Sequence, residues 1–154
     1  NIQIRRNMII KLEHSSEKIA EQIFTVFQNA YKIEAQLIGA HDFPPLSRSA
    51  KDIQNSMTQF YGFIENNCHA GVIEIVIEIK RLKIDSVTVD PHYFRKGIAH
   101  KLIDYVLGTM VVSEVMVETA VTNLPAINLY KKHGFAEFKR WTPSHGIEKL
   151  AMSV

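Results

Sequence analysis

The sequence contains one cysteine, Cys68, among its 154 residues. A single cysteine excludes an intramolecular disulfide and a four-cysteine zinc cluster, and sparse cysteine is typical of a reducing compartment. We interpret Cys68 as a turn residue. No apolar run approaches the roughly 18 residues of a membrane span, and the N-terminus lacks the apolar core of a signal peptide. These absences favour a cytoplasmic protein without a membrane partner.

An excess of either charge is also missing. The 18 Lys and Arg residues nearly balance 16 Asp and Glu residues, which leaves a formal net charge of +2. Domains that bind nucleic acid usually carry a marked basic excess, so nucleic acid is not the expected partner and a basic site must be local. No group of histidines and carboxylates has metal-ligand spacing, so no metal is expected. Neither G-x-G-x-x-G nor G-x-x-x-x-G-K-[ST] occurs, which disfavours a dinucleotide-binding fold and a P-loop enzyme.

The residues that are present describe one globular domain. Hydrophobic residues make up 46% of the chain, with no internal repeat or linker. We expect the domain to span residues 8–154, because a strand-like run starts at Met8. Residues 1–7 are then either a vector-derived tag or a disordered N-terminal extension.

Hydrophobic spacing predicts eleven elements in the order β-α-α-β-β-β-α-β-α-β-β. The expected strands cover residues 8–14, 58–67, 69–80, 81–89, 113–121, 135–141 and 147–154. The expected helices cover residues 15–39, 49–57, 98–107 and 124–133. This order favours an α/β (α+β) protein with a mixed sheet and helices on both faces.

Several boundaries and faces follow from single residues. Ser15 or Ser16 is the expected N-cap of the first helix, and Gly39 and Gly108 are expected to end the first and third helices. Two consecutive prolines exclude a helix from residues 40–49. The first helix is expected to bury one face, and the strand over 69–80 to be half-buried with alternate isoleucines inward. These faces contain Ile19, Ile23, Phe27 and Ala30, and Ile73, Ile75, Ile77 and Ile79.

The stretch "VTVDPHYFRKGIA", residues 87–99, predicts an anion site. A strand ends near Asp90 and a helix begins near Ile98, so the first turn presents backbone N–H groups without helical partners. Gly97 leaves room for a ligand against the main chain. Nearby cations, from Arg95, Lys96, Lys101, His92 and His100, suit a phosphate. An ordinary glycine turn before a helix remains the alternative interpretation.

Two blocks resemble the GNAT superfamily of N-acyltransferases. Val89-Asp90-Pro91 followed by residues 94–99 resembles its acetyl-CoA-binding motif, V-x-P and then [QR]-x-x-G-x-[GA]. Phe94 occupies the Gln/Arg position, so a side-chain role there is lost. Residues 123–135, "NLPAINLYKKHGF", resemble N-x-x-A-I-x-L-Y-x-K-x-G-F. Both blocks occur in the family's order, and the resemblance covers essentially the whole chain.

The resemblance implies the GNAT fold, with a mixed, mostly antiparallel central sheet of about seven strands. It also implies acetyl-CoA as the acyl-donor cosubstrate. In the family the fourth and fifth strands splay apart, and the freed main chain of the fourth binds pantetheine and the thioester oxygen. The cofactor-binding residues implied are Val87, Thr88, Val89, Arg95, Lys96, Gly97, Ile98, Ala99, His100, Asn123, Tyr130 and Lys132.

The resemblance further implies direct acetyl transfer to a primary amine. Tyr130 is expected to protonate the departing thiolate, although a packing role is its alternative. Asp85 is the expected general base, with an exposed strand-end residue as its alternative. Glu118 is the next candidate for the base, although a Glu at this place in the family is commonly structural. His41 and His145 are weaker candidates for the base because they fall in loops that would border the acceptor cleft.

The acceptor is not determined by these motifs. A small-molecule amine and a peptide or protein amine both remain open, and so do a monomer and a homodimer. Carboxylate and aromatic residues near the expected cleft would suit a cationic amine: Tyr31, Glu34, His41, Asp42, Phe43 and Trp141. Two rival functions are a catalytically inactive CoA-binding regulatory module, suggested by Phe94, and a nucleic-acid-binding domain that uses the basic turn.

Overall fold

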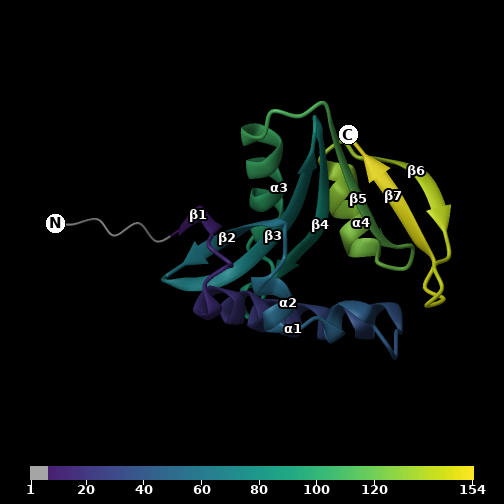
Figure 1. The fold of residues 1–154 in the computed structure, drawn as a ribbon. Helices are drawn as coiled ribbons and strands as arrows, with labels where there is room; N and C mark the ends of the chain where they lie inside the picture. Colours follow the sequence, from purple (N-terminus) through teal and green to yellow (C-terminus); the bar gives the residue numbers. More distant parts are fainter. Residues whose placement is uncertain (1–6) are drawn as a thin grey trace.

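The computed structural model describes residues 7–154, which form a seven-stranded sheet with helices on both faces (Figure 1). The strand order is β1-β2-β3-β4-β5-β7-β6, and all neighbours are antiparallel except β4 and β5. The strands are β1 (Asn7–Leu12), β2 (Gln59–Glu65), β3 (Cys68–Glu78), β4 (Arg81–Val89), β5 (Glu114–Ala120), β6 (Ala136–Trp141) and β7 (Lys149–Ser153). The predicted element order is confirmed. Asn7 opens β1, while the rest of the expected extension, residues 1–6, lies outside the described residues.

Within residues 7–154, four α-helices flank the sheet. They are α1 (Glu17–Ile38), α2 (Ala50–Gln54), α3 (Ile98–Thr109) and α4 (Leu124–Lys132). Ser16 is the N-cap of α1, and Gly39 ends that helix with φ 70°. In α2, Ser49 and Asp52 form a capping box, which explains how so short a helix is held.

Three sequence-based expectations about helices were wrong. Gly108 lies inside α3, which continues to Thr109 because the buried Val106 keeps this last turn packed on the core. Residues 40–49 include a 3-10 turn over Pro44–Ser47, since proline tolerates the first positions of a helical turn. On α1, the predicted Ile23 and Phe27 are buried and Ile19 packs against their cluster, but Ala30 is only partly buried and belongs to no core cluster. The buried residues of the helix are Ala20, Ile23, Val26, Phe27, Tyr31 and Ala35.

The centre of the sheet is covered on both faces, which overturns the expected half-buried third strand. Residues 70–75 of β3 are all buried, Glu74 included. Val72 packs in the cluster formed with α1 and α2, whereas Ile73 and Ile75 pack in the larger cluster formed with α3 and α4. Beyond this covered region the strand leaves the core. Ile77 is therefore exposed at the strand end.

The turns around β3 are set by left-handed residues. Asn66 and Asn67 both have positive φ and connect β2 to β3, as the hairpin prediction requires. Cys68 is the exposed first residue of β3, so its assignment to the turn was wrong by one position. Ile79 has φ 56° in the next turn and is 98% exposed, so the alternation of isoleucines does not extend to it.

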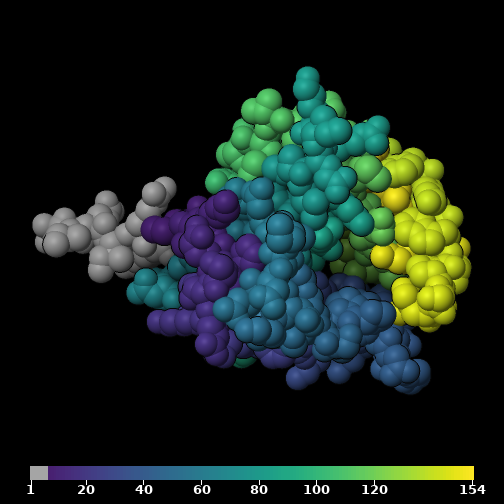
Figure 2. All heavy atoms as spheres, in the orientation of Figure 1, coloured from purple at the N-terminus to yellow at the C-terminus, as the bar shows by residue number. Residues whose placement is uncertain are grey.

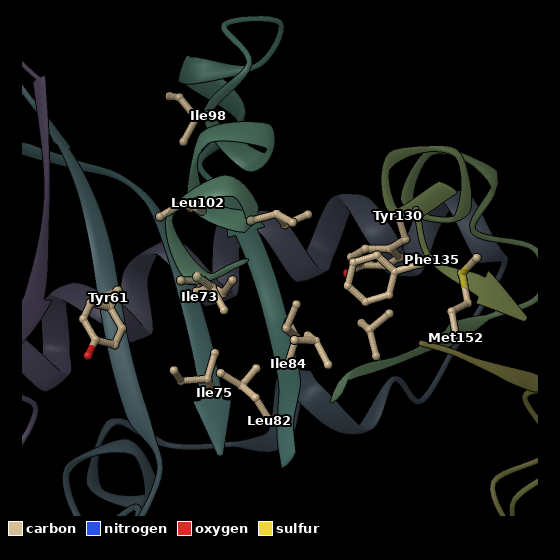
Figure 3. Packing of buried hydrophobic residues seen from close by; sticks show 14 of the residues in the cluster. Tyr61, Ile73, Ile75, Leu82, Ile84, Ile98, Leu102, Tyr130, Phe135 and Met152 are labelled. Carbon is tan, nitrogen blue, oxygen red and sulfur yellow. The ribbon is translucent and has the colours of Figure 1, made fainter. Parts of the chain in front are cut away.

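The larger cluster continues across the gap between β4 and β5 (Figure 3). Ile98 and Leu102 of α3 lie above β3 and β4 on one side of the view, and Tyr130 and Phe135 lie beyond β4 on the other. The core therefore ties α3 and α4 to the same sheet. This packing holds the start of both helices beside the ends of β4 and β5.

A β-bulge marks the point at which β4 leaves β5. Glu74 of β3 pairs with Ser86 and Ile75 pairs with Ile84, so Asp85 is the extra residue. The β4–β5 pairing covers Arg81–Ile84 against Glu114–Val117 and ends there. Bulges bend a strand and terminate pairing, so the divergence begins at Asp85. The splay implied by the family resemblance is present.

Candidate active site

The separation of the two strands leaves one edge of β4 without a strand partner. Val87, Thr88 and Val89 pair with β3 on their other edge. Beyond Ile84 no residue of β5 pairs with them. Backbone N–H and C=O groups on such an edge can hydrogen-bond to an extended ligand, as in recognition by strand addition. This edge fits the amide chain of pantetheine.

The start of α3 has the backbone geometry expected for the predicted anion cradle. Gly97 is the N-cap residue with φ 71°, and Arg95 also has a positive φ of 66°. The first helical bond runs from Lys101 N to Gly97 O, 3.1 Å apart, and no side chain caps the helix. The N–H groups of residues 98–100 therefore have no helical acceptor, and the helix dipole adds positive potential there.

A cleft of about 590 Å³, which we call the cofactor cleft, connects this cradle with the free edge of β4. Except for Tyr130, every cofactor-binding residue expected from the sequence lines it: Val87, Thr88, Val89, Arg95, Lys96, Gly97, Ile98, Ala99, His100, Asn123 and Lys132. Lys96 Nζ lies 3.1 Å from Glu65 Oε2, so that charge is partly compensated. Arg95 and Lys132 also line the cleft and make no ion pair within residues 7–154. The exposed Phe94 also lines this cleft.

Asn123 closes the inner end of the cleft. It is 6% exposed, and its Oδ1 accepts from Ala126 N at 3.3 Å, so it is both the predicted turn residue and a helix cap. Among residues 7–154, nothing accepts a hydrogen bond from its Nδ2. Asn123 lines the cleft, so this N–H group is available to donate to a carbonyl oxygen of pantetheine. The residues therefore fit acetyl-CoA.

A second pocket, of about 290 Å³, continues beyond this point, and we call it the acceptor pocket. Figure 2 shows the surface hollowed between the blue segment near residues 40–50 and the yellow C-terminal strands. The pocket is lined by Tyr31, Glu34, Phe43, Pro44, Pro45, Asp85, Ser86, Val87, Glu118, Thr119, Ala120, Asn123, Ala126, Tyr130, His145, Ile147 and Lys149. Of the loop candidates, His145 lines it, whereas His41, Asp42 and Trp141 do not.

Tyr130 lines the acceptor pocket instead of the cofactor cleft. Its ring packs on Phe135 with centroids 5.6 Å apart, and the residue is buried. Burial raises the pKa of Tyr130, and the negative charge of Glu34 and the nearby Tyr31 add to the shift. The hydroxyl therefore keeps its proton at neutral pH and can donate it.

The carboxylates of the acceptor pocket differ in their partners. Glu118 lies 3.2 Å from both Lys83 and Lys149. Burial alone would raise the pKa of Glu118, but these two lysines hold it below its usual value. Glu34 and Asp85 make no ion pair with the described residues. Burial raises the pKa of Glu34. Asp85 is an exposed residue of β4, as its alternative interpretation supposed, and its pKa is raised by the partial desolvation of the carboxyl group in the pocket and by the neighbouring Glu74.

Next to the acceptor pocket lies a third cavity of about 360 Å³, which we call the outer cavity. It is lined by Tyr31, Pro45, Arg48, Thr58, Glu74 and Asp85. Arg48 holds the buried Glu74 through two bonds of 2.7 and 2.9 Å, and the Thr58 hydroxyl donates to the same carboxylate at 2.7 Å. The outer cavity therefore has a fixed ion pair beside the unpaired Asp85.

Sequence reasoning placed Tyr31 and Glu34 near the acceptor cleft but missed the contribution of α1 to the cofactor cleft. Ala30, Ile33, Glu34 and Leu37 line the cofactor cleft, and the last two turns of α1 present them beside β4. Their spacing of three or four residues marks one helix face, which is the available signal. It does not reveal that this face opposes a ligand, because that depends on tertiary packing.

Comparisons with known proteins agree with the fold and the site described above. The model of the GNAT acetyltransferase family matches residues 21–135. The chain belongs to the GNAT acetyltransferase family. It is 35% identical over 141 residues to the UPF0157 protein YqkA of Bacillus subtilis, covering 91% of this chain and 41% of YqkA. An N-alpha-acetyltransferase of Sulfurisphaera tokodaii is 40% identical over 65 residues, covering 40% of this chain and 39% of that protein. This GNAT chain thus spans about two fifths of either relative.

Solved structures agree with the GNAT fold. The PaiA N-acetyltransferase of Thermoplasma acidophilum, solved with coenzyme A, has a TM-score of 0.78 at 18% identity and covers 97% of this chain and 98% of its own. The ribosomal-protein-S18-alanine N-acetyltransferase of Escherichia coli has a TM-score of 0.75 at 20% identity, with 96% and 92% covered. At these identities the likeness concerns the fold.

Residues 7–154 contain neither a membrane-spanning helix nor a group of side chains arranged to hold a metal ion. No helix between residues 7 and 154 combines the length and apolar character of a membrane span. Within the same range, no group of three or more His, Cys, Asp or Glu residues is arranged to hold a metal ion.

Proposed function

We propose that this GNAT chain is an N-acetyltransferase that moves the acetyl group of acetyl-CoA to a primary amine by direct attack in a ternary complex. The observation that carries the proposal is the meeting of the two pockets. Glu34, Val87, Asn123 and Ala126 border both the cofactor cleft and the acceptor pocket. A thioester at this junction would face an amine from the other side, with no need for a covalent enzyme intermediate.

The main chain would bind the donor. The first-turn N–H groups of α3 suit the pyrophosphate, and Arg95 and Lys132 would add charge for the remaining phosphate. The free edge of β4 and the Asn123 amide suit the pantetheine arm. A main-chain N–H near Val87 would donate to the thioester oxygen as negative charge develops on it.

Side chains of the acceptor pocket would handle the protons. Tyr130 keeps its proton and is proposed to transfer it to the departing sulfur. Asp85, the base predicted from the sequence, lines the same pocket, so that role stays a prediction. Glu34 is a second carboxylate in this pocket. Either Asp85 or Glu34 could therefore receive the proton of the incoming amine.

The direct test is an acetyl-transfer assay with acetyl-CoA and a panel of amines. The panel should include alkyl monoamines, diamines, amino acids and peptides with free N-termini. We expect free thiol to be released at the same rate at which acetylated amine forms. Tight acetyl-CoA binding without transfer to any amine would instead favour the inactive CoA-binding module.

Gly97→Glu tests the cradle. The substitution places a carboxylate beside the helix N-terminus at a residue with positive φ, so acetyl-CoA affinity should fall at least 100-fold in calorimetry. Gly108→Glu makes the same change at the other end of α3, where a Cβ meets nothing within 4 Å, and should leave affinity unchanged. Gly97→Asn tolerates the left-handed backbone and should keep most affinity. Undiminished binding by the Glu variant would show that the phosphates lie elsewhere.

A further inference from the structure

The three cavities form a series with a carboxylate at each boundary. Glu34 is the titratable residue shared by the cofactor cleft and the acceptor pocket. Tyr31, Pro45 and Asp85 are shared by the acceptor pocket and the outer cavity. The acceptor pocket therefore has Glu34 at its inner end, where the thioester would lie, and Asp85 at its outer end.

Glu34 and Asp85 differ from the other two carboxylates of these cavities, Glu74 and Glu118, in having no cationic partner in contact. Glu74 is paired with Arg48, and Glu118 with Lys83 and Lys149. Neither Glu34 nor Asp85 has a hydrogen bond or an ion pair within residues 7–154. The charged groups facing Glu34 include Lys149, and those facing Asp85 include Lys83 and Arg48 as well as Glu74 and Glu118. Two negative charges in one narrow pocket thus lack a matched cation.

The size and the lining of the acceptor pocket restrict which acceptor molecule can bring cationic groups to these two carboxylates. A volume of about 290 Å³ lies at the low end of ligand pockets, which favours a slender chain. Phe43, Tyr31 and the two prolines at 44 and 45 offer apolar surface between the charged ends. Methylene groups suit that surface, while an acceptor carboxylate would meet Asp85 at the outer end.

We propose that the acceptor is an aliphatic diamine or polyamine, with its reacting amine at Glu34 and a second ammonium at Asp85. The proposal rests on the acetyl transfer proposed above and assigns the two carboxylates different tasks. Glu34 is the proton acceptor at the reacting end. Asp85 binds the acceptor at the far end, which differs from the role predicted for it from the sequence.

The protons balance in this scheme. Glu34 takes one proton from the incoming ammonium and later passes it to solvent. The neutral nitrogen forms a C–N bond with the acetyl carbon, and the C–S bond breaks. Tyr130 gives a proton to the sulfur and regains one from the nitrogen through solvent. The products are the N-acetylated amine, the coenzyme thiol and one released proton.

Matched acceptors separate the two tasks. 1-Aminobutane and 1,4-diaminobutane have the same chain length and differ by one ammonium group. The unmodified protein should prefer the diamine in kcat/KM by about tenfold, the low end for a bond to a charged group. Asp85→Asn should remove most of this preference by raising KM for the diamine. Equal kcat/KM for both acceptors in the unmodified protein would overturn the proposal.

Glu34→Gln should lower kcat for both amines by about 100-fold at neutral pH. The kcat of this variant should recover in part at high pH, where the amine loses its proton unaided. Because the pKa of Glu34 is raised, the unmodified protein should lose activity as pH falls through that raised value. A pH-dependent loss of kcat in Asp85→Asn, without one in Glu34→Gln, would return the base to Asp85 and overturn the assignment.

Glu137→Gln is the matched control, because it makes the same change at a carboxylate that pairs with Arg140 and lines none of the three cavities. It should leave the diamine preference intact. Melting temperature and acetyl-CoA affinity, measured on each preparation, verify folding and donor binding. Transfer to peptides but not to diamines would overturn this inference alone, whereas no transfer to any amine would overturn the proposed function.

Discussion

The buried hydroxyl of Tyr130 leads to a prediction that separates packing from proton transfer. Tyr130→Phe keeps the ring that contacts Phe135, so folding and acetyl-CoA affinity should change little. The missing proton should lower kcat by about 100-fold, the lower end for general acid catalysis, because a thiolate is a tolerable leaving group. Melting, calorimetry and turnover on one preparation measure all three quantities.

The outcome for Tyr130 depends on comparing these quantities. Normal turnover in the Phe variant would show that Tyr130 is a packing residue. Phe135→Leu offers a control that disturbs the same contact and leaves the hydroxyl in place. It should lower stability more than Tyr130→Phe and turnover less.

The Arg48–Glu74 pair predicts a large effect on stability. Glu74 is 2% exposed and takes both Arg48 bonds, so Arg48→Met would leave a buried carboxylate without its cation. Breaking such a pair costs about 3–5 kcal/mol, whereas replacing both partners with apolar residues is far less costly. Urea unfolding of Arg48→Met and of the double variant Arg48→Met/Glu74→Leu measures the difference. Equal losses in the two variants would contradict this view of the pair.

At the scale of elements, Gly71 of β3 controls how closely α3 approaches the sheet. A Cβ at Gly71 would lie 2.8 Å from Ile98 Cγ2 and 3.1 Å from the Thr88 carbonyl oxygen. Gly71→Ala should therefore cost about 1–3 kcal/mol by overpacking. Because Ile98 is the first residue of α3, the shift should also weaken acetyl-CoA binding.

A second glycine gives the control for this prediction. The three atoms nearest to a Cβ at Gly62 would be side-chain atoms of Leu12, at 2.9–3.2 Å, on the opposite face of the sheet. Gly62→Ala can relax by a rotation of Leu12 and should leave acetyl-CoA affinity unchanged. If Gly71→Ala binds acetyl-CoA as tightly as Gly62→Ala, the position of α3 does not depend on Gly71.

The elements were predictable where their signals are local. The hydrophobic face of α3 and the asparagine turn before β3 follow from spacing and turn chemistry, and both were predicted. The burial of Glu74 was not predicted, because its partner Arg48 lies 26 residues away along the chain. The bulge at Asp85 was likewise invisible, since it depends on the register between β3 and β4.

For the whole molecule, the donor site was more predictable than the acceptor site. The donor motifs are short segments whose main chain does the binding, so eleven of the twelve expected cofactor residues line the cleft and Tyr130 lies in the adjoining pocket. The acceptor pocket combines α1, the loop after it, β4, β5 and the last loop. Glu34 becomes visible as a boundary residue only after these segments pack together.

The short parallel pairing in the sheet has a thermodynamic consequence. Four residue pairs join β4 to β5, so the strands form two sub-sheets, β1–β4 and β5–β7, with few shared backbone bonds. Acetyl-CoA bound in the cofactor cleft would contact β4 of one sub-sheet and α4, which follows β5 of the other, and would make their opening cooperative. At 100 times its dissociation constant it should add about 2.7 kcal/mol and raise Tm by about 5–10 °C. Amide exchange should slow in β5 and β7 as well as in β4, because the bound donor would couple the opening of the two sub-sheets.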